Sequence, residues 1–326
     1  MEHKTLAIPP HLISNVFGKL DENILKIEQS FGVHVINRGD FLQITGKAAE
    51  GANFAAAEAV LQKLAVFAAQ SPGEVSAQQV NYLIASQGEA EFAHIEKINE
   101  DTVCLTAAGR PIKPKTLGQK KYLDNIRKNT VVFAIGPAGT GKTYLAMAMA
   151  VTAFRNQLVN RIILTRPAIE AGEKLGFLPG DLQQKVDPYL RPLYDALHDI
   201  MGAETFQRNL EKGAIEVAPL AYMRGRTLDN AFIVLDEAQN TTPEQMKMFL
   251  TRIGFNAKAV ITGDITQIDL PEGKQSGLRH AARILSNIED IGVCELSAKD
   301  VVRHPLVQKI INAYEKIEKK TGGKHA

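Results

Sequence analysis

One glycine-rich stretch of the chain, GPAGTGKT, combines the residue types that bind the phosphates of a nucleotide. It matches the pattern GxxxxGK[ST] and lies between VVFAI, an apolar run typical of a strand, and TYLAMAMAVTAF, an apolar run typical of a helix. In this pattern, backbone N–H groups and a lysine bind the phosphates, and a hydroxyl coordinates Mg2+. The alternative is a Gly-rich turn without chemistry, which the spacing and the context together disfavour. We expect a nucleoside triphosphate to be bound by Gly136, Pro137, Ala138, Gly139, Thr140, Gly141, Lys142 and Thr143.

Two acidic residues end a second apolar run, FIVLDEAQN. Asp236 lies where a carboxylate can hold Mg2+ together with Thr143, and Glu237 follows it directly. A second carboxylate beside the metal suits activation of water, so the pair favours hydrolysis over transfer to a substrate hydroxyl. We therefore expect Lys142, Asp236 and Glu237 to be catalytic, the alternative being a strand that ends in two solvated acids. The chain has no NKxD motif, which disfavours a guanine-specific switch.

A candidate sensor of the γ-phosphate follows a third apolar run, AKAVITGDITQ. The run ends in Gly263 and Asp264, and the amide of Gln267 could contact the γ-phosphate or the attacking water; an ordinary polar turn is the alternative. Several arginines could stabilise charge on the same phosphate or could form surface salt bridges instead: Arg166, Arg224, Arg226 and Arg303.

The elements that must position these residues alternate short apolar runs with segments of helical periodicity. VVFAI, RIILT, FIVLDE, AKAVITGD and VCELS predict buried strands, and TTPEQ predicts the start of a helix with Thr242 as its N-cap. The pattern indicates an α/β fold with a mostly parallel sheet, and together with the glycine-rich motif it resembles the P-loop NTPase (RecA-like) arrangement, which implies helices on both faces. Ligands bind at the carboxyl ends of such strands, where the acidic candidates lie.

Two changes in composition divide the chain. QSPGE closes a small Ala-rich segment, and AAGRPIKPKTLGQKK, rich in Pro, Gly and basic residues, is typical of a connector. We expect an N-terminal α+β domain at residues 1–70, a helical bridge and basic linker at residues 71–118, and a P-loop ATPase domain at residues 119–326.

Bulk properties bear on location and partners. The chain has 326 residues, 45% of them hydrophobic, but no apolar run of about 18 residues and no charged-then-apolar leader, so we expect a cytoplasmic protein without a membrane partner. Cys104 and Cys294 lie far apart with no Cys or His at ligand spacing, which favours reduced thiols over a disulfide or a zinc site. The net charge of +2 neither requires nor excludes a polyanionic partner.

The N-terminal segment bears on a nucleic-acid partner. HKTLAIP, HLISNVFGKLDENILKIEQSFG, VHVINRGDFLQITG and the Ala-rich run after them predict the order βααββα, which resembles a KH domain. KH domains grip single-stranded RNA or DNA with a GxxG loop. The corresponding residues are Gly18, Lys19, Leu20 and Asp21, and the carboxylate of Asp21 either opposes a phosphate or caps the next helix. Binding of single-stranded RNA on the one hand, and a structural or protein-binding use on the other, are both open; the basic residues available for RNA are Lys19, Lys26, Arg38 and Lys47.

The motifs TLGQ, GPAGTGKT, LDEAQN and GDITQ together resemble those of the PhoH-like ATPases, relatives of superfamily-one helicases. LTRPAIEAGEKLGFLPGD, AYMRGRTLDNAFIVLDEAQN and DVVRHPLVQKII are similar to this family and to few others, and the resemblance extends to about residue 320. It implies a homo-oligomer, a hexamer in similar proteins, and work beside a ribosomal-RNA maturation endonuclease. It also implies ATP and Mg2+ as cofactors and the following roles: Gln119 at the adenine, Asp236 and Glu237 at metal and water, Gln267 as sensor, and Arg303 facing the nucleotide.

Chain length bears on the mechanism. A two-lobed helicase needs a second α/β lobe of roughly 100–200 residues, yet about sixty residues follow GDITQ. A transition-state arginine from across the site must then come from another subunit of a closed ring. We weigh an ATPase that remodels or unwinds RNA against an ATP-switched adaptor that recruits an RNA-processing nuclease. A small-molecule kinase ranks third, since no acceptor pocket is recognisable.

Overall fold

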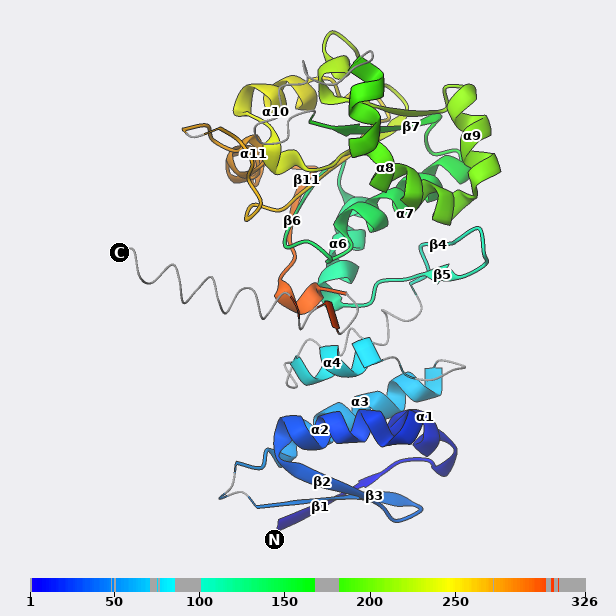
Figure 1. The fold of residues 1–326 in the computed structure, drawn as a ribbon, viewed down its shortest axis with the longest axis vertical. Coiled ribbons are helices and arrows are strands. Elements are labelled where there is room, and N and C mark those ends of the chain that lie inside the picture. The colour runs from blue at the N-terminus through cyan, green and yellow to red at the C-terminus, as the bar shows by residue number, and fades with distance from the viewer. Residues whose placement is uncertain are drawn as a thin grey trace. The chain divides into compact units, whose positions relative to one another are not determined.

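The computed structural model describes residues 2–47, 51–70, 77–85, 101–167, 182–271 and 273–302, together with the single residues 49, 75, 306, 307 and 310. The chain forms two compact units, drawn in Figure 1. Unit 1 comprises residues 1–100 and 302–326, and unit 2 comprises residues 101–301. Each unit has buried apolar side chains of its own.

Unit 1 is an α+β domain with the order β1, α1, α2, β2, β3, α3 (Figure 1). Its antiparallel sheet places β3 (Phe41–Gly46) between β1 (Glu2–Ala7) and β2 (Val33–Asn37). The helices are α1 (Ile13–Phe17), α2 (Glu22–Phe31), α3 (Phe54–Gln70) and α4 (Ala77–Ala85). The first six elements follow the βααββα order of a KH-like domain.

The loop between α1 and α2 contains three residues in the left-handed region of backbone space. Gly18, Leu20 and Asp21 have φ values of 75°, 51° and 58°. Of the two alternatives for Asp21, capping of α2 is not observed, because its side chain accepts no hydrogen bond from the helix. A capping side chain needs an extended backbone at the N-cap, which Asp21 lacks. Leu20 is 96% exposed, so this loop presents its backbone and an apolar side chain to solvent.

Unit 2 is built on a six-stranded sheet in which every pair of neighbouring strands is parallel. From edge to edge the strands are β11 (Ile291–Glu295), β6 (Val131–Ile135), β10 (Lys258–Gly263), β9 (Ala231–Leu235), β7 (Arg161–Arg166) and β8 (Ile215–Pro219). All residues of β6 and β9 are buried, as expected of central strands covered on both faces. Because the strands are parallel, the polar residues that follow them gather at one edge of the sheet.

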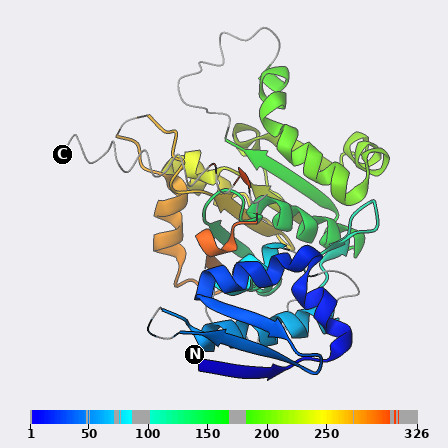
Figure 2. The same ribbon diagram turned by 60° about the horizontal axis from the view of Figure 1, so that its bottom comes forward.

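Helices cover both faces of this sheet (Figures 1 and 2). One face packs against α6 (Leu117–Lys128), α7 (Lys142–Arg155), α8 (Leu182–Met201) and α9 (Ala203–Glu211), and the other against α10 (Pro243–Leu250) and α11 (Gly277–Leu285). Alternation along β6 separates the two cores, because Val132 and Ala134 belong to the first while Phe133 and Ile135 belong to the second. The α/β fold with helices on both faces is therefore present.

The five strands predicted for the larger domain are present, and α10 begins as the sequence predicts. Thr242 and Gln245 form a reciprocal capping box around Pro243. The edge strand β8 is not among the predicted strands. Its run, IEVAP, is short and contains a charge and a proline, features that weaken a strand signal.

The segment expected as a basic linker is partly folded into unit 2. β4 (Cys104–Leu105) and β5 (Pro111–Ile112) pair as a short antiparallel hairpin. Val103 and Ile112 are buried in the core that α7 also lines, and Thr152 Oγ1 donates to the Val103 carbonyl at 3.1 Å. Unit 2 accordingly begins at residue 101, whereas the sequence places the boundary at residue 119. The Pro and Gly residues mark a hairpin here and not an open connector.

Both cysteines of unit 2 are free thiols. Burial raises the pKa of Cys294 to about 11 and also raises the pKa of Cys104, so both thiols are protonated at neutral pH. In the described part of the chain, every helix is too short or too polar to cross a bilayer.

The packing of α10 is tested by comparing a buried phenylalanine within the helix with an exposed one shortly after its end. Phe249 is fully buried in the core between α10 and the sheet, whereas Phe255 is 86% exposed. Phe249→Ala is expected to lower the free energy of unfolding by about 3–5 kcal/mol, because it leaves a cavity in that core. Phe255→Ala is expected to change it by less than about 0.5 kcal/mol. Urea unfolding followed by circular dichroism measures both; equal losses would contradict the placement of α10.

Candidate functional site

The glycine-rich loop joins the carboxyl end of β6 to the start of α7. Gly139 and Gly141 have φ values of 86° and 79°, which glycine adopts without strain. A Cβ on Gly136 would lie 2.5 Å from the carbonyl oxygen of Leu296, so this position has no room for a side chain. The loop therefore has the close backbone turns and the helix N-terminus that bind phosphates.

Lys142 is the first residue of α7, and its side chain turns back into the loop. Its Nζ donates to the carbonyl oxygens of Gly136 at 2.6 Å and Pro137 at 3.0 Å, and the residue is only 8% exposed. The hydroxyl of Thr140 also donates to the Pro137 carbonyl, at 2.8 Å. The charge of Lys142 thus lies inside the loop, where a β- or γ-phosphate would lie.

Thr143 and Asp236 are brought together although 93 residues separate them. Thr143 Oγ1 donates to Asp236 Oδ1 at 2.7 Å, and Thr262 Oγ1 of β10 donates to the same oxygen at 2.7 Å. Asp236 is 7% exposed. A hydroxyl and a carboxylate at the end of a phosphate loop are the oxygen donors that Mg2+ accepts, so these residues fit the metal predicted from the sequence.

Glu237 follows β9 in the left-handed conformation, with φ of 51°. Its Oε2 accepts a hydrogen bond from Gln239 Nε2 at 2.5 Å, and its Oε1 lies 3.3 Å from Nη2 of Arg166. The Glu237 side chain is 34% exposed. The candidate base therefore has defined neighbours on both oxygens and remains accessible to water.

Asp264, which the sequence places after β10 without a role, contacts the phosphate loop. Its Oδ2 accepts the N–H of Ala138 at 3.0 Å, and its Oδ1 accepts the N–H and the hydroxyl of Thr266. The backbone N–H of Gln267 donates to the Asp264 carbonyl at 3.1 Å, and Gln267 is exposed to solvent. Gln267 thus lies beside the residue that contacts the loop; its role as a sensor stays a prediction.

Gln119 lies in the first turn of α6 and braces the phosphate loop. Its Nε2 donates to the Thr140 carbonyl at 3.0 Å, and its Oε1 accepts the N–H of Lys115 at 2.7 Å. Tyr122, one turn later, donates its hydroxyl to the Lys142 carbonyl at 3.0 Å, and burial raises the pKa of this phenol. Gln119 is only 4% exposed, and its contact with adenine stays a prediction.

Asp300 is a second buried carboxylate to which the sequence assigns no role. Its Oδ1 accepts the hydroxyl of Thr116, the N-cap of α6, at 2.6 Å, and its Oδ2 accepts the N–H and the hydroxyl of Ser297. A Cβ on Gly118 would lie 2.3 Å from Asp300 Oδ1, which explains the glycine in TLGQ. The available signal is the capping-box spacing of Ser297 and Asp300 after β11.

The candidate arginines have different surroundings. Arg166 contacts Glu237, as described above, so its salt bridge is part of the site and not of the outer surface. Arg226 forms a two-pronged ion pair with Glu216, at 2.5 and 2.7 Å. Arg224 is exposed, and Arg303 lies outside the described residues.

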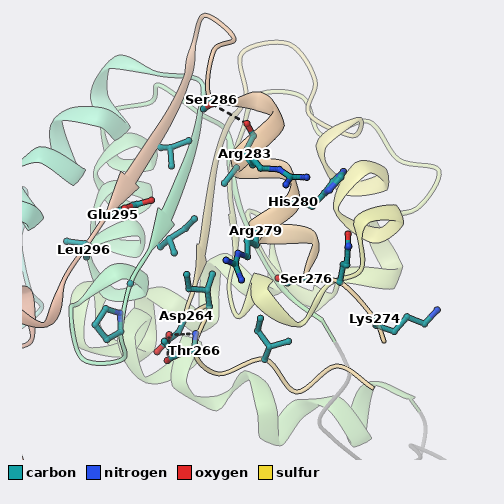
Figure 3. Close-up of a pocket in the computed structure, with 18 residues that line it drawn as sticks. Asp264, Thr266, Lys274, Ser276, Arg279, His280, Arg283, Ser286, Glu295 and Leu296 are labelled. Carbon is teal, nitrogen blue, oxygen red and sulfur yellow. Dashed lines mark hydrogen bonds between the residues drawn. The ribbon is translucent and has the colours of Figure 1, made fainter. Parts of the chain in front are cut away.

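A cavity of about 1010 Å3 adjoins the start of the phosphate loop (Figure 3). It lies between Gly136 and Pro137 on one side and α11 on the other, and Asp264 and Thr266 form part of its wall. The charged and titratable residues that line it are Lys274, Arg279, His280 and Arg283, with the carboxylates of Asp264 and Glu295. The cavity is therefore mostly basic on the side of α11, where Arg279 and Arg283 extend from the helix.

The family model and the curated relatives that match this sequence agree on one protein family. Residues 111–315 match the family described as PhoH-like protein. A PhoH-like protein of Mycobacterium tuberculosis is 52% identical over 322 residues, which cover 98% of this chain and 89% of that protein. A PhoH-like protein of Bacillus subtilis is 51% identical over 314 residues, covering 96% and 97%. A solved structure, the SWI2/SNF2 ATPase core of Sulfolobus solfataricus in complex with dsDNA, matches with a TM-score of 0.33 and 14% identity over 55% of this chain and 43% of that chain.

The anchoring role of Asp300 is tested by its removal. Asp300→Ala leaves the hydroxyl of Thr116 and the N–H of Ser297 without their carboxylate acceptor in a site where Asp300 is 6% exposed. We expect a loss of about 2–3 kcal/mol in the free energy of unfolding, because buried donors lose a charged partner. Glu204→Ala, at a side chain that is 91% exposed, is the control and should leave the unfolding midpoint unchanged. An Asp300→Ala midpoint equal to that of the control would show that the anchor is not needed.

Proposed function

The chain belongs to the PhoH-like protein family and has an ATPase-type phosphate loop, and on that premise we propose that it is a Mg2+-dependent ATPase whose hydrolysis is coupled to the binding and remodelling of RNA. The observation that carries the ATPase part is the meeting of Lys142, Thr143 and Asp236 at one end of the sheet, with Glu237 next to them. These residues supply the positive charge, the metal ligands and the base that hydrolysis of a triphosphate needs.

Each side chain has a separate task in this proposal. The loop N–H groups and Lys142 hold the β- and γ-phosphates, and Thr143 and Asp236 hold the metal. Bound Mg2+ supplies positive charge that offsets the charge developing on the phosphates. Glu237 accepts the proton of the attacking water at a carboxylate that solvent reaches. To Gln267, beside Asp264, we assign the response to the γ-phosphate.

Coupling to single-stranded RNA is supported by unit 1. Its βααββα order is that of KH-like domains, whose loop between the first two helices grips nucleic-acid backbone. In this chain the loop keeps left-handed backbone at Leu20 and Asp21 and carries Lys19. The carboxylate of Asp21 opposes a phosphate and favours the alternative, in which the unit binds a protein and the chain acts as an ATP-switched adaptor for an RNA-processing nuclease, such as a ribosomal-RNA maturation endonuclease.

We further propose that the protein acts in the cytoplasm as a homo-oligomer, a hexamer by similarity. The candidate site lies at the carboxyl edge of one sheet, and Glu237 and Gln267 are accessible there. A neighbouring copy in a ring can therefore reach the γ-phosphate side with an arginine, for which Arg303 is the candidate.

Two substitutions separate binding from hydrolysis. Lys142→Ala should abolish ATP binding, because the loop loses its only side-chain charge, whereas Glu237→Gln should bind ATP normally and hydrolyse it about 100- to 10,000-fold more slowly. Fluorescent-nucleotide titration and phosphate release measure the two steps, with Glu204→Gln as the surface control. Hydrolysis by Glu237→Gln at the parental rate would remove Glu237 as the base. A parental protein that neither binds nor hydrolyses ATP would overturn the proposed function.

RNA coupling is tested by substitutions at two positions of the loop between α1 and α2 and by the ATPase rate. Single-stranded RNA should raise the ATPase rate of the parental protein. Asp21→Gly should bind that RNA more tightly, because glycine suits the φ of 58° and removes a charge from the path of a phosphate. Asp21→Asn, which removes the charge alone, should show part of the gain, and Lys19→Glu should weaken binding. RNA that changes neither the rate nor the affinity in any variant would support the adaptor function.

A further inference from the structure

The sheet itself brings Arg166 to Glu237. β7 and β9 are neighbouring parallel strands, with Thr165 opposite Leu235, and the N–H of Asp236 continues the ladder by donating to the Thr165 carbonyl at 2.9 Å. Arg166 ends β7, so its side chain leaves the sheet beside the residues that follow β9. Its Nη2 lies 3.3 Å from Glu237 Oε1, and the Arg166 side chain is only 18% exposed. The strand register fixes where the Arg166–Glu237 ion pair forms, and Arg166 is largely shielded from solvent. The pair therefore differs from an ordinary surface salt bridge, whose two long side chains are mobile in water.

A second residue holds the other oxygen of Glu237. Gln239 is 1% exposed, and its two amide atoms are both engaged: Nε2 donates to Glu237 Oε2 at 2.5 Å, and Oε1 accepts the N–H of Asp264 at 3.1 Å. A Cβ on Gly263 would lie 2.7 Å from Gln239 Oε1, so a side chain at position 263 would collide with this amide. Gln239 is therefore a fixed support on one side, and Arg166 supplies the contact on the opposite side.

The backbone of Glu237 needs such support. A left-handed conformation at a residue with a side chain costs about 1–2 kcal/mol and persists where the surroundings impose it. With φ of 51°, Glu237 turns its carboxylate toward Arg166 and Gln239 and away from the buried strand that precedes it. Small errors in the position of a reacting group are costly, since a displacement of about 1 Å can reduce a rate by about 100-fold.

We propose that Arg166 is a positioning residue for ATP hydrolysis: its guanidinium holds the carboxylate of Glu237, against the fixed amide of Gln239, in the orientation that takes a proton from water. This inference rests on the proposed ATPase function. Arg166 forms and breaks no bond in the reaction and acts through Glu237. The planar fork of an arginine fixes both the charge and the direction of the contact, whereas a lysine supplies the charge alone.

The test compares Arg166→Met and Arg166→Lys in single-turnover hydrolysis and at steady state. Arg166→Met should lower the single-turnover rate and kcat by about 10- to 100-fold and leave KM within about 2-fold, because nucleotide contacts are untouched. Arg166→Lys should recover only part of the loss, because lysine keeps the charge without the directed contact. Arg161→Met is the control in the same strand: its side chain contacts the Asp229 carbonyl at the opposite end of β7, and its kcat should equal that of the parent.

A double substitution decides whether Arg166 acts through Glu237. In the Glu237→Gln background, Arg166→Met should slow hydrolysis no further, because the carboxylate that it positions is gone. A further 10-fold loss in that background would show that Arg166 acts directly on the phosphates and would overturn the inference, as would a raised KM with unchanged kcat. An active parent with an equally active Arg166→Met would overturn the inference alone, whereas an inactive parent would overturn the proposed function and the inference together.

Discussion

The geometry of unit 2 depends on the carboxylate of Asp236. One of its oxygens accepts hydroxyl hydrogens from Thr143 and Thr262, so α7, β9 and β10 meet at a single atom. The register of β9 and β10, with Leu235 opposite Ile261, places Thr262 at this position. A slip of one residue would turn Thr262 to the opposite face of the sheet. The apolar cores on both faces forbid that slip, so packing far from the site fixes the geometry of Thr143 and Asp236, the residues that we propose as metal ligands.

The groups that we propose to bind phosphates already have partners within the protein. Lys142 Nζ is bound to two loop carbonyls, and the N–H of Ala138 is bound to the carboxylate of Asp264. A triphosphate would exchange these hydrogen bonds for bonds to phosphate oxygens. Its affinity therefore reflects the difference in free energy between the loop with its internal hydrogen bonds and the loop bound to phosphate. The γ-phosphate would also bring negative charge close to Asp264. Since Asp264 is bound through its N–H to Gln239, and Gln239 to Glu237, the loop and the candidate base share one chain of hydrogen bonds.

The sequence predicts those parts of the site that are contiguous in the chain. The phosphate loop, the acidic end of β9 and five of the six strands of the sheet follow from local spacing and apolar runs, because each signal lies within a few residues. Asp264, Asp300 and the bracing role of Gln119 do not follow, because each depends on contacts between remote segments, such as the 184 residues between Thr116 and Asp300. The hairpin that begins at Cys104 does not follow from the sequence either, but for the opposite reason. Its signal is local yet ambiguous, because Pro and Gly are typical of both a linker and a tight turn.

Helix α6 is the element through which both ends of unit 2 reach the phosphate loop. Asp101, the first residue of the unit, forms ion pairs with Lys120 and Arg127 of α6. Asp300, one residue before the unit ends, accepts the hydroxyl of Thr116 at the N-cap of the same helix. Gln119 on this helix then donates to the Thr140 carbonyl of the loop. The chain passes between the two units at residues 100–101 and 301–302, so each passage is tied within one or two residues to the helix that braces the loop. α6 thus links the two points where the chain enters and leaves unit 2 to the phosphate loop through ion pairs and hydrogen bonds.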